Sequence, residues 1–135
     1  MAVQNSVAVR NAGLDSQETT IGVLAVLKIR TGAQPATCAT ADAGTVLATL
    51  NLPSDWMSAA AAGAKAKLGT WEDLSADAAG TAAHWRLYAS DGVTCHKQGS
   101  VTATGGGGDM TVDNVVFAAA QAFTITAFTI TAGNA

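Results

Sequence analysis

The stretch TAAHWRLYASDGVTCHKQGSVTAT (81–104) decides the fold of this chain. In its first half, Trp85 and Leu87 alternate with polar neighbours such as Arg86, which is the two-residue period of a β-strand. The Ser-Asp-Gly sequence at 90–92 is a strong turn signal, and the residues after it can return as a second strand. We therefore expect a β-hairpin here, with Trp85 in the core.

Two further strands are predicted before this hairpin. The segment VLAVLKIR (23–30) is rich in β-branched residues, and the segment TVLATLN (45–51) alternates before Pro53 ends it. The residues between them include Pro35 and many small side chains, which is typical of a loop. These segments can extend the hairpin into a sheet.

After the hairpin, GGGGDMTVDNVVF (105–117) and QAFTITAFTITAG (121–133) predict two more strands. In the second of them, Phe123 shares a face with Ile125, whereas Phe128 falls on the opposite face. Either a bulge near the middle of the segment or a strand buried on both faces would reconcile the two patterns.

The segment from Ser54 to Trp71 is ambiguous. Ser54 or Asp55 could cap an Ala-rich helix that runs to Ala62. The following AGAKAKLGTW (62–71) alternates, and it could be a strand with Lys65 and Lys67 on its solvated face. We expect three basic residues to lie on solvated faces or to form salt bridges at a subunit interface: Lys65, Lys67 and Arg86.

The N-terminal residues 6–19 predict a short amphipathic helix. Asn5 or Ser6 can cap it, Gly22 lies just beyond its end, and one inward stripe would hold Val7, Asn11 and Leu14. The fold class expected from all these segments is mainly β: an antiparallel β-sandwich or jelly-roll-like domain of six to seven strands with a short N-terminal helix. We expect one domain over 1–135, with the arm and helix in 1–20 and the β-sandwich in 21–135.

The composition favours a domain that other subunits cover. Of the 135 residues, 30 are Ala and only 27 are Leu, Ile, Val or Phe, so large apolar side chains are scarce. Charged residues make up 13% of the chain, about half the usual share. A weakly charged surface with a modest core gains stability when it is buried against copies of itself or against a shell.

Several classes of partner are disfavoured by charge and hydropathy. The net charge is −3 and no basic run is present, which argues against nucleic-acid binding. No apolar stretch approaches the ~18 residues of a membrane span, and the N-terminus shows no secretory signal pattern. We expect a chain made and kept in a cytoplasm until assembly.

The two cysteines, Cys38 and Cys95, allow three interpretations. A metal site with His96 is disfavoured, because neighbours such as Cys95 and His96 point to opposite faces of a strand. A disulfide between Cys38 and Cys95 is possible if the protein leaves the cell, where conditions are oxidising. The leading interpretation is a pair of inert, buried thiols.

No catalytic or cofactor-binding constellation is visible in the sequence. The glycine run 105–108 is followed by a strand rather than by a lysine and a helix, so it is not a phosphate-binding loop. The only histidines, His84 and His96, lie in one hairpin, and the adjacent pair Glu72 and Asp73 is typical of a solvated loop. We expect no enzymatic activity, no cofactor, no metal and no small-molecule substrate.

The remaining large aromatic residues are Trp56 and Trp71, which flank the Ala-rich segment. An exposed tryptophan can anchor a subunit interface or stack on a sugar. In a chain this poor in large side chains, each can equally be needed to fill the core. Both alternatives remain open from the sequence.

The order of segments resembles a family of small structural proteins of tailed bacteriophages. The matching pieces are NSVAVRNAGLD, LKIRTGAQPA, GTVLATLNLP, AGTAAHWRLYASDG, GGGGDMTVDN and FTITAFTITAG, which together cover most of the chain. The resemblance implies a non-enzymatic protein located in the virion and assembled in the bacterial cytoplasm. Its partners would be itself, as a homo-oligomer, and other virion proteins such as the major capsid protein.

Three functions are compatible with this resemblance and with the composition. The first is a capsid decoration (cement) protein that stabilises the head lattice, with the arm Ala2–Asn5 as a docking extension and edge strands that pair with neighbours. The second is a neck, collar or tail-associated structural protein. The third is a glycan-binding surface module that uses Trp56 or Trp71.

Overall fold

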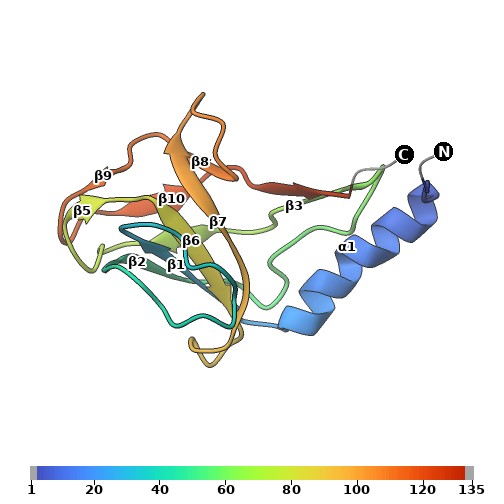
Figure 1. The fold of residues 1–135 in the computed structure, drawn as a ribbon, viewed down its shortest axis with the longest axis horizontal. Helices are drawn as coiled ribbons and strands as arrows, with labels where there is room; N and C mark the ends of the chain where they lie inside the picture. The colour runs from blue at the N-terminus through green and yellow to red at the C-terminus, as the bar shows by residue number, and fades with distance from the viewer. Residues whose placement is uncertain (1–2, 133–135) are drawn as a thin grey trace.

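The computed structural model describes residues 3–132. Their fold is mainly β with an N-terminal helix, as the sequence predicts, and Figure 1 gives its layout. In chain order the elements are α1 (Val7–Ile21), β1 (Val26–Arg30), β2 (Val46–Asn51), β3 (Ala64–Ala66), β4 (Trp71–Asp73), β5 (Gly80–Thr81), β6 (His84–Tyr88), β7 (Cys95–Ala103), β8 (Met110–Val112), β9 (Val116–Phe117), β10 (Phe123–Ile125) and β11 (Thr129–Thr131).

Helix α1 begins after the predicted cap Ser6 and ends at Ile21, two residues beyond the predicted end at residue 19. The Ser6 hydroxyl caps it by accepting a hydrogen bond from Val9 N (3.2 Å), and the C-terminal cap is Gly22, whose φ of 93° suits glycine. Leu14 is buried, but Val7 is exposed, so the predicted inward stripe is only partly correct. The reason is that α1 lies against a narrow ribbon and not against the full sheet (Figure 1).

The predicted hairpin is present and forms the centre of a five-stranded sheet with the order β2-β1-β6-β7-β8. Strands β6 and β7 pair antiparallel, and Trp85 lies opposite Gly99. Strand β8 pairs with β7 in parallel, which departs from the predicted all-antiparallel arrangement. The glycines at 105 and 107, both with positive φ, let the chain double back tightly enough for this pairing.

The other strands are short and pair in twos: β10 with β4, β11 with β3, and β5 with β9. The predicted Ala-rich helix before residue 62 is absent. Trp56 and Met57 are both 2% exposed, and an extended path brings both into the core. The C-terminal segment divides into β10 and β11, which join different partners, so neither the predicted bulge nor a single doubly buried strand is needed to explain Phe128.

The core lies on one face of the five-stranded sheet, where aromatic rings from distant segments meet. The ring of Phe128 lies 5.7 Å from that of Trp71 and 5.5 Å from that of Trp85, measured between centroids. The opposite face of the sheet is covered by the loop 31–45, and every residue of β6 is buried as a result. At the end remote from this core, α1 and the β3–β11 ribbon project together (Figure 1).

Candidate functional site

A polar cluster centred on Asp42 fastens the loop 31–45 to the sheet. Asp42 Oδ1 accepts hydrogen bonds from Arg86 Nη1 and from the Tyr88 hydroxyl (2.6 Å), and Oδ2 accepts one from Arg30 Nη2 (3.1 Å). Arg30, Arg86 and Tyr88 are all buried. Two guanidinium groups from adjacent strands therefore share one carboxylate, a geometry that pairs their buried charges.

Arg86 also binds the main chain of the same loop. Its Nη2 atom donates to the carbonyl oxygens of Thr37, Cys38 and Thr40 at 3.0–3.1 Å, and its Nε atom donates to Gln98 Oε1 at 3.2 Å. The expectation of a solvated or intersubunit Arg86 is wrong, because the residue is 1% exposed and its ion pair lies within the chain. The cluster holds the loop 31–45 against the sheet, with the Asp42 side chain 38% exposed at its outer end.

Proton affinities in the cluster follow from burial and hydrogen bonding. Burial, followed by the hydrogen bond to Asp42, raises the pKa of Tyr88 to about 12. Burial alone would raise the pKa of Asp42, but hydrogen bonds from Tyr88 and Arg86 outweigh it and lower that pKa below its usual value. Asp42 is therefore ionised and Tyr88 neutral at neutral pH, the states in which each satisfies the other.

Cys38 belongs to the loop 31–45, and Cys95 belongs to β7, which that loop covers. Both cysteines are free and half-buried, and the Cys95 thiol donates to Lys97 O at 3.5 Å. Burial, followed by the neighbouring Cys38 thiol, raises the pKa of Cys95 to about 11. The structure thus brings together the two residues proposed for a disulfide and holds them as thiols.

A second buried ion pair lies between α1 and the ribbon. Lys65 Nζ is 2.7 Å from Asp15 Oδ1 and 3.1 Å from Glu18 Oε1, and it donates to Ser58 O at 2.8 Å. Lys65 is 2% exposed, so its predicted position on a solvated face is wrong. Side chains do alternate between the two faces of β3, as predicted. The face that carries Lys65 was expected to be exposed to solvent, but α1 covers it.

Trp56 and Trp71, left open between core and interface, are both core residues in this structure. They are 2% and 1% exposed, their ring centroids are 6.1 Å apart, and each indole N–H is satisfied inside the chain. Trp56 Nε1 donates to Gly22 O (3.0 Å) and Trp71 Nε1 to Trp56 O (3.1 Å). Neither ring is available on this surface for a partner or a sugar.

The residues weighed for catalysis or metal binding do not converge. His84 is fully buried with Nδ1 2.8 Å from Gly32 O, whereas His96 is exposed. Asp73 accepts hydrogen bonds from Thr49 N and Ser75 N, which fixes a turn. Across residues 3–132, no three His, Cys, Asp or Glu side chains lie close enough together to hold one metal ion.

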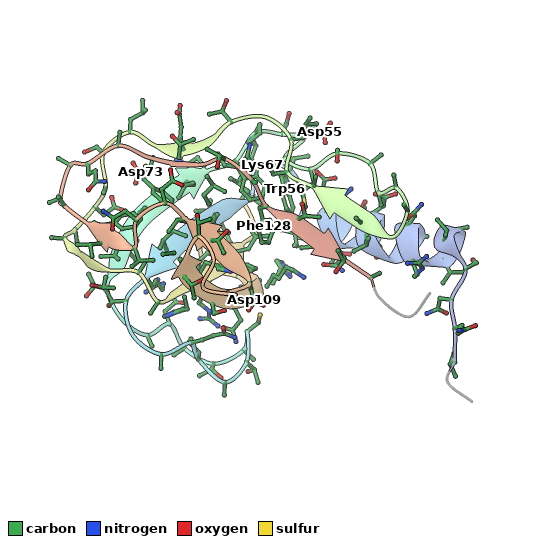
Figure 2. The ribbon with its side chains drawn as sticks, turned by 90° about the horizontal axis from the view of Figure 1, so that it is seen from above. Asp55, Trp56, Lys67, Asp73, Asp109 and Phe128 are labelled. Carbon is green, nitrogen blue, oxygen red and sulfur yellow. The ribbon has the colours of Figure 1, made fainter. Side chains whose placement is uncertain are left out.

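The glycine run leads into a turn that shapes a groove. After it, Asp109 Oδ2 accepts hydrogen bonds from Ser100 N (3.0 Å) and Ser100 Oγ (3.2 Å), which anchors the start of β8 beside β7. Asp109 and Phe128, both labelled in Figure 2, line the resulting groove. The groove has a volume of about 300 Å³ between β7 and β11. It is lined by Trp85, Lys97, Gln98, Asp109, Phe128 and Thr129–Thr131.

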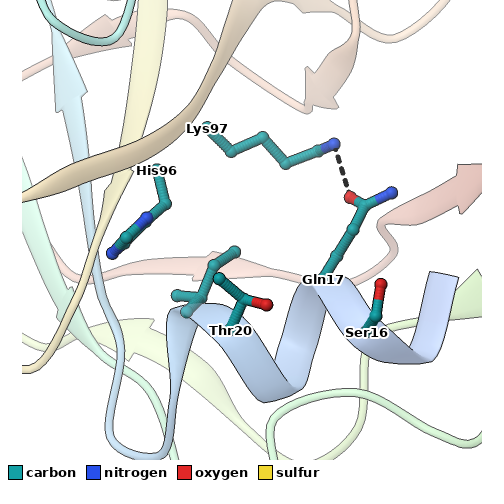
Figure 3. A pocket seen from close by; sticks show the side chains of 6 residues that line it. Ser16, Gln17, Thr20, His96 and Lys97 are labelled. Atoms are coloured by element: carbon teal, nitrogen blue, oxygen red, sulfur yellow. Dashed lines mark hydrogen bonds between the residues drawn. The ribbon is translucent and has the colours of Figure 1, made fainter. Parts of the chain in front are cut away.

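A smaller cavity of about 190 Å³ lies on the other side of Lys97, between β7 and α1 (Figure 3). Lys97 Nζ donates to Gln17 Oε1 at 2.9 Å and so spans this cavity. His96 and Ser16 also line it, and the Ser16 hydroxyl donates to Gly13 O at 2.8 Å within α1. The cavity marks where α1 meets the sheet.

The sequence did not predict the groove between β7 and β11 or the cavity between β7 and α1. It also did not predict the ion pairs of Asp42 and Lys65. An isolated acidic residue in a loop carries no sequence signal for its distant partners. Which strands lie beside one another in a sheet, and which surfaces they form, likewise depends on the fold as a whole.

Comparison with protein-family models, curated proteins and solved structures finds no match for this chain. The helix found in residues 3–132 is neither long nor apolar enough to cross a membrane. What the chain does must therefore be inferred from its own residues and geometry.

Proposed function

We propose that this chain is a non-enzymatic structural protein of a tailed-bacteriophage virion, and specifically a capsid decoration protein. It would be assembled in the bacterial cytoplasm, and its partners would be copies of itself and the major capsid protein. The finer architecture that we propose is a β-sandwich, in which the five-stranded sheet is faced by the paired short strands.

The observation that carries this proposal is the distribution of polar groups. The charged side chains at Asp42, Arg86 and Lys65 are engaged in holding the loop 31–45 and α1 in place. Within residues 3–132, in contrast, no strand pairs with the second edge of β11, and on the edge of β7 away from β6 only Val101–Ala103 are paired. Open strand edges favour association with another polypeptide by strand addition.

The same geometry fits a neck, collar or tail-associated protein, which also assembles by side-to-side contact. The glycan-binding alternative has lost its basis, because it required an exposed ring at Trp56 or Trp71 and both rings are buried. Decoration and neck or tail functions differ in copy number, and copy number is therefore the property to measure.

The test is quantitative mass spectrometry of purified particles, with the major capsid protein as the internal reference. We expect hundreds of copies per particle, as for a protein that covers a lattice. A count that matches one small ring would replace the decoration function with a neck or tail function. Absence of the chain from the particle would overturn the proposal as a whole.

A further inference from the structure

A turn of the chain projects beside the groove between β7 and β11. Residues 104–108, which we call the glycine turn, join β7 to β8, and Figure 1 shows this turn extending beyond the sheet. Asp109 follows the turn and lines the groove. A second hollow of about 210 Å³ is lined by Gly108 and shares Phe128 and Thr129 with the groove. The molecule therefore carries a projection and a hollow next to each other.

The glycine turn is fixed at its base and carries no side chain at its tip. Gly108 N donates to Thr102 Oγ1 at 3.0 Å, which holds the turn against β7. Gly105 and Gly107 have φ of 89° and 78°, and open space surrounds the position that a Cβ would take at either residue. The tip is therefore exposed main chain, and no side chain covers its N–H and C=O groups.

One wall of the groove is an edge of β7. Val101 N donates to Ala83 O on the β6 side, and the direction of main-chain groups alternates along a strand of an antiparallel pair. Gln98 therefore directs its N–H and C=O groups away from β6. Within residues 3–132, β8 pairs with this edge only at Val101–Ala103, so the edge beside Gln98 can pair with a further main chain.

The floor of the groove holds a polar atom without a partner. Trp85 lines the groove and is 2% exposed, and its Nε1 atom makes no hydrogen bond within the described part of the chain. Gly99 lies over this part of the indole, where a Cβ would be 2.8 Å from Nε1. A buried indole N–H normally finds an acceptor, and a main-chain carbonyl is the commonest one in a protein.

We propose that two copies of this chain associate about a two-fold axis, with the glycine turn of each copy in the groove of the other. A projection beside a hollow is complementary to a second copy of itself, because a two-fold rotation brings each projection to the other copy's hollow. The two contacts then form together and close the assembly. The exposed carbonyl groups of the turn supply acceptors for the Gln98 N–H and for the floor of the groove.

Charge agrees with this occupant. The groove holds one cationic and one anionic side chain, Lys97 and Asp109, and both make hydrogen bonds within the chain, to Gln17 and from Ser100. The glycine turn carries no charged side chain. It therefore enters the groove without leaving a buried charge unpaired.

The first test is cross-linking between two differently substituted chains. In a Cys38→Ser/Cys95→Ser background, Thr104→Cys in the turn and Thr131→Cys in the groove are made as separate proteins, one of them labelled with ¹⁵N. The two are mixed and oxidised by dioxygen with copper-phenanthroline. We expect a disulfide-linked mixed dimer, which its mass identifies, because docking raises the effective concentration of the two thiols.

The matched control mixes Thr104→Cys with Thr124→Cys, an exposed position on β10 that is not part of the groove lining. We expect roughly tenfold more mixed dimer with Thr131→Cys than with this control. Absence of the mixed dimer, or equal amounts in the two mixtures, would overturn the proposal.

The second test measures the mass of the unmodified protein in solution by light scattering over a range of concentrations. We expect a dimer that dissociates on dilution. Gly107→Asn adds a side chain to the tip with a residue that tolerates positive φ, and Thr131→Lys adds a charge to the groove. Each should shift the dimer towards monomer while the circular dichroism spectrum stays that of the parent, and Thr124→Lys should leave the dimer unchanged. A parent that is monomeric throughout, or a dimer unaffected by both variants, would contradict the proposed contact.

This inference rests on the proposed function as an assembly protein, but the two can fail separately. Cross-linking and light scattering use the purified chain without particles, whereas the copy number is measured on particles. A chain found on particles that forms no mixed dimer would retain its function and lose this contact. A chain that forms the mixed dimer and is absent from particles would retain the contact and lose the function.

Discussion

Lys65 Nζ lies 2.7 Å from Asp15 Oδ1, although Lys65 belongs to β3 and Asp15 to α1. The Lys65 side chain is 2% exposed and therefore buried, whereas the Asp15 side chain is 48% exposed and remains in contact with water. This contact, with that of Glu18, attaches a helix that otherwise buries little apolar surface.

We expect Lys65→Met to destabilise the protein. Removing one member of a buried pair costs about 3–5 kcal/mol, but Asp15 can rehydrate, so about 1–3 kcal/mol is expected. Urea unfolding measures this change.

The matched control is Lys67→Met, two residues along the same segment. Lys67 donates to Gly69 O and lies over the Trp71 ring, so its loss should change the free energy of unfolding by about 0.5 kcal/mol or less. Equal effects of the two substitutions would show that the ion pair does not hold α1 in place.

Tyr88 should titrate late and stabilise the protein up to high pH. Its folded pKa of about 12 exceeds the unfolded value of about 10. Its contribution to stability is therefore complete below pH 10 and is lost as the pH rises from there through 12.

Tyr88 is the only tyrosine, so phenolate absorbance in the near ultraviolet reports it alone. We expect a midpoint near pH 12 in the folded chain and near pH 10 in urea, with tryptophan fluorescence recording whether the fold persists. A folded midpoint near 10 would contradict the buried hydrogen bond to Asp42.

Two glycine substitutions should have opposite effects. An alanine Cβ at Gly99 would lie 2.7–2.8 Å from ring atoms of Trp85, so Gly99→Ala should destabilise the protein by about 1–3 kcal/mol. Gly13 lies within α1 with open space around it, so Gly13→Ala should stabilise by about 0.5–1 kcal/mol. Thermal unfolding of both variants checks this, and a tolerated Gly99→Ala would place the Trp85 ring elsewhere.

The thiols of Cys38 and Cys95 should form an internal disulfide when an oxidant is supplied. Oxidised glutathione would accept two electrons and two protons from the thiol pair and leave as two glutathione molecules. We expect the intact mass to fall by two hydrogens, and the reaction to be slow at neutral pH because the pKa of Cys95 is about 11.

The Cys38→Ser variant is the control for this reaction, and it should yield only a mixed disulfide with glutathione. Two unreacted thiols in the parent under denaturing, non-reducing conditions, after long oxidation, would contradict the prediction. Closure of the loop between the two residues should raise stability by up to about 4 kcal/mol.

The local parts of the fold could be predicted because their causes are local. The hydroxyl of Ser6 and the freedom of Gly22 define α1, and the Ser-Asp-Gly turn defines the β6–β7 hairpin. Trp85 was placed in the core from its alternation with Arg86, and it is buried. Each of these signals lies within a few residues of the structure that it specifies.

The wrong predictions concern which face of a strand is buried and which distant segments pack together. The alternating pattern identifies the two faces of β3. Which face is exposed to solvent depends on where α1 packs, so the pattern alone wrongly predicts an exposed Lys65. The Ala-rich segment favours a helix locally, but burying Trp56 and Met57 overrides that preference.

The sequence by itself determined the mainly β class, the N-terminal helix with its ends, and the central hairpin, because caps, turns and periodicity act between neighbours in the chain. The tertiary structure alone decided that Asp42 joins Arg30 to Arg86, that Cys38 neighbours Cys95, and that Gln98 and Thr131 line one groove. Such contacts join residues far apart in sequence, and they form only where packing of the whole chain minimises exposed apolar surface and unpaired charge.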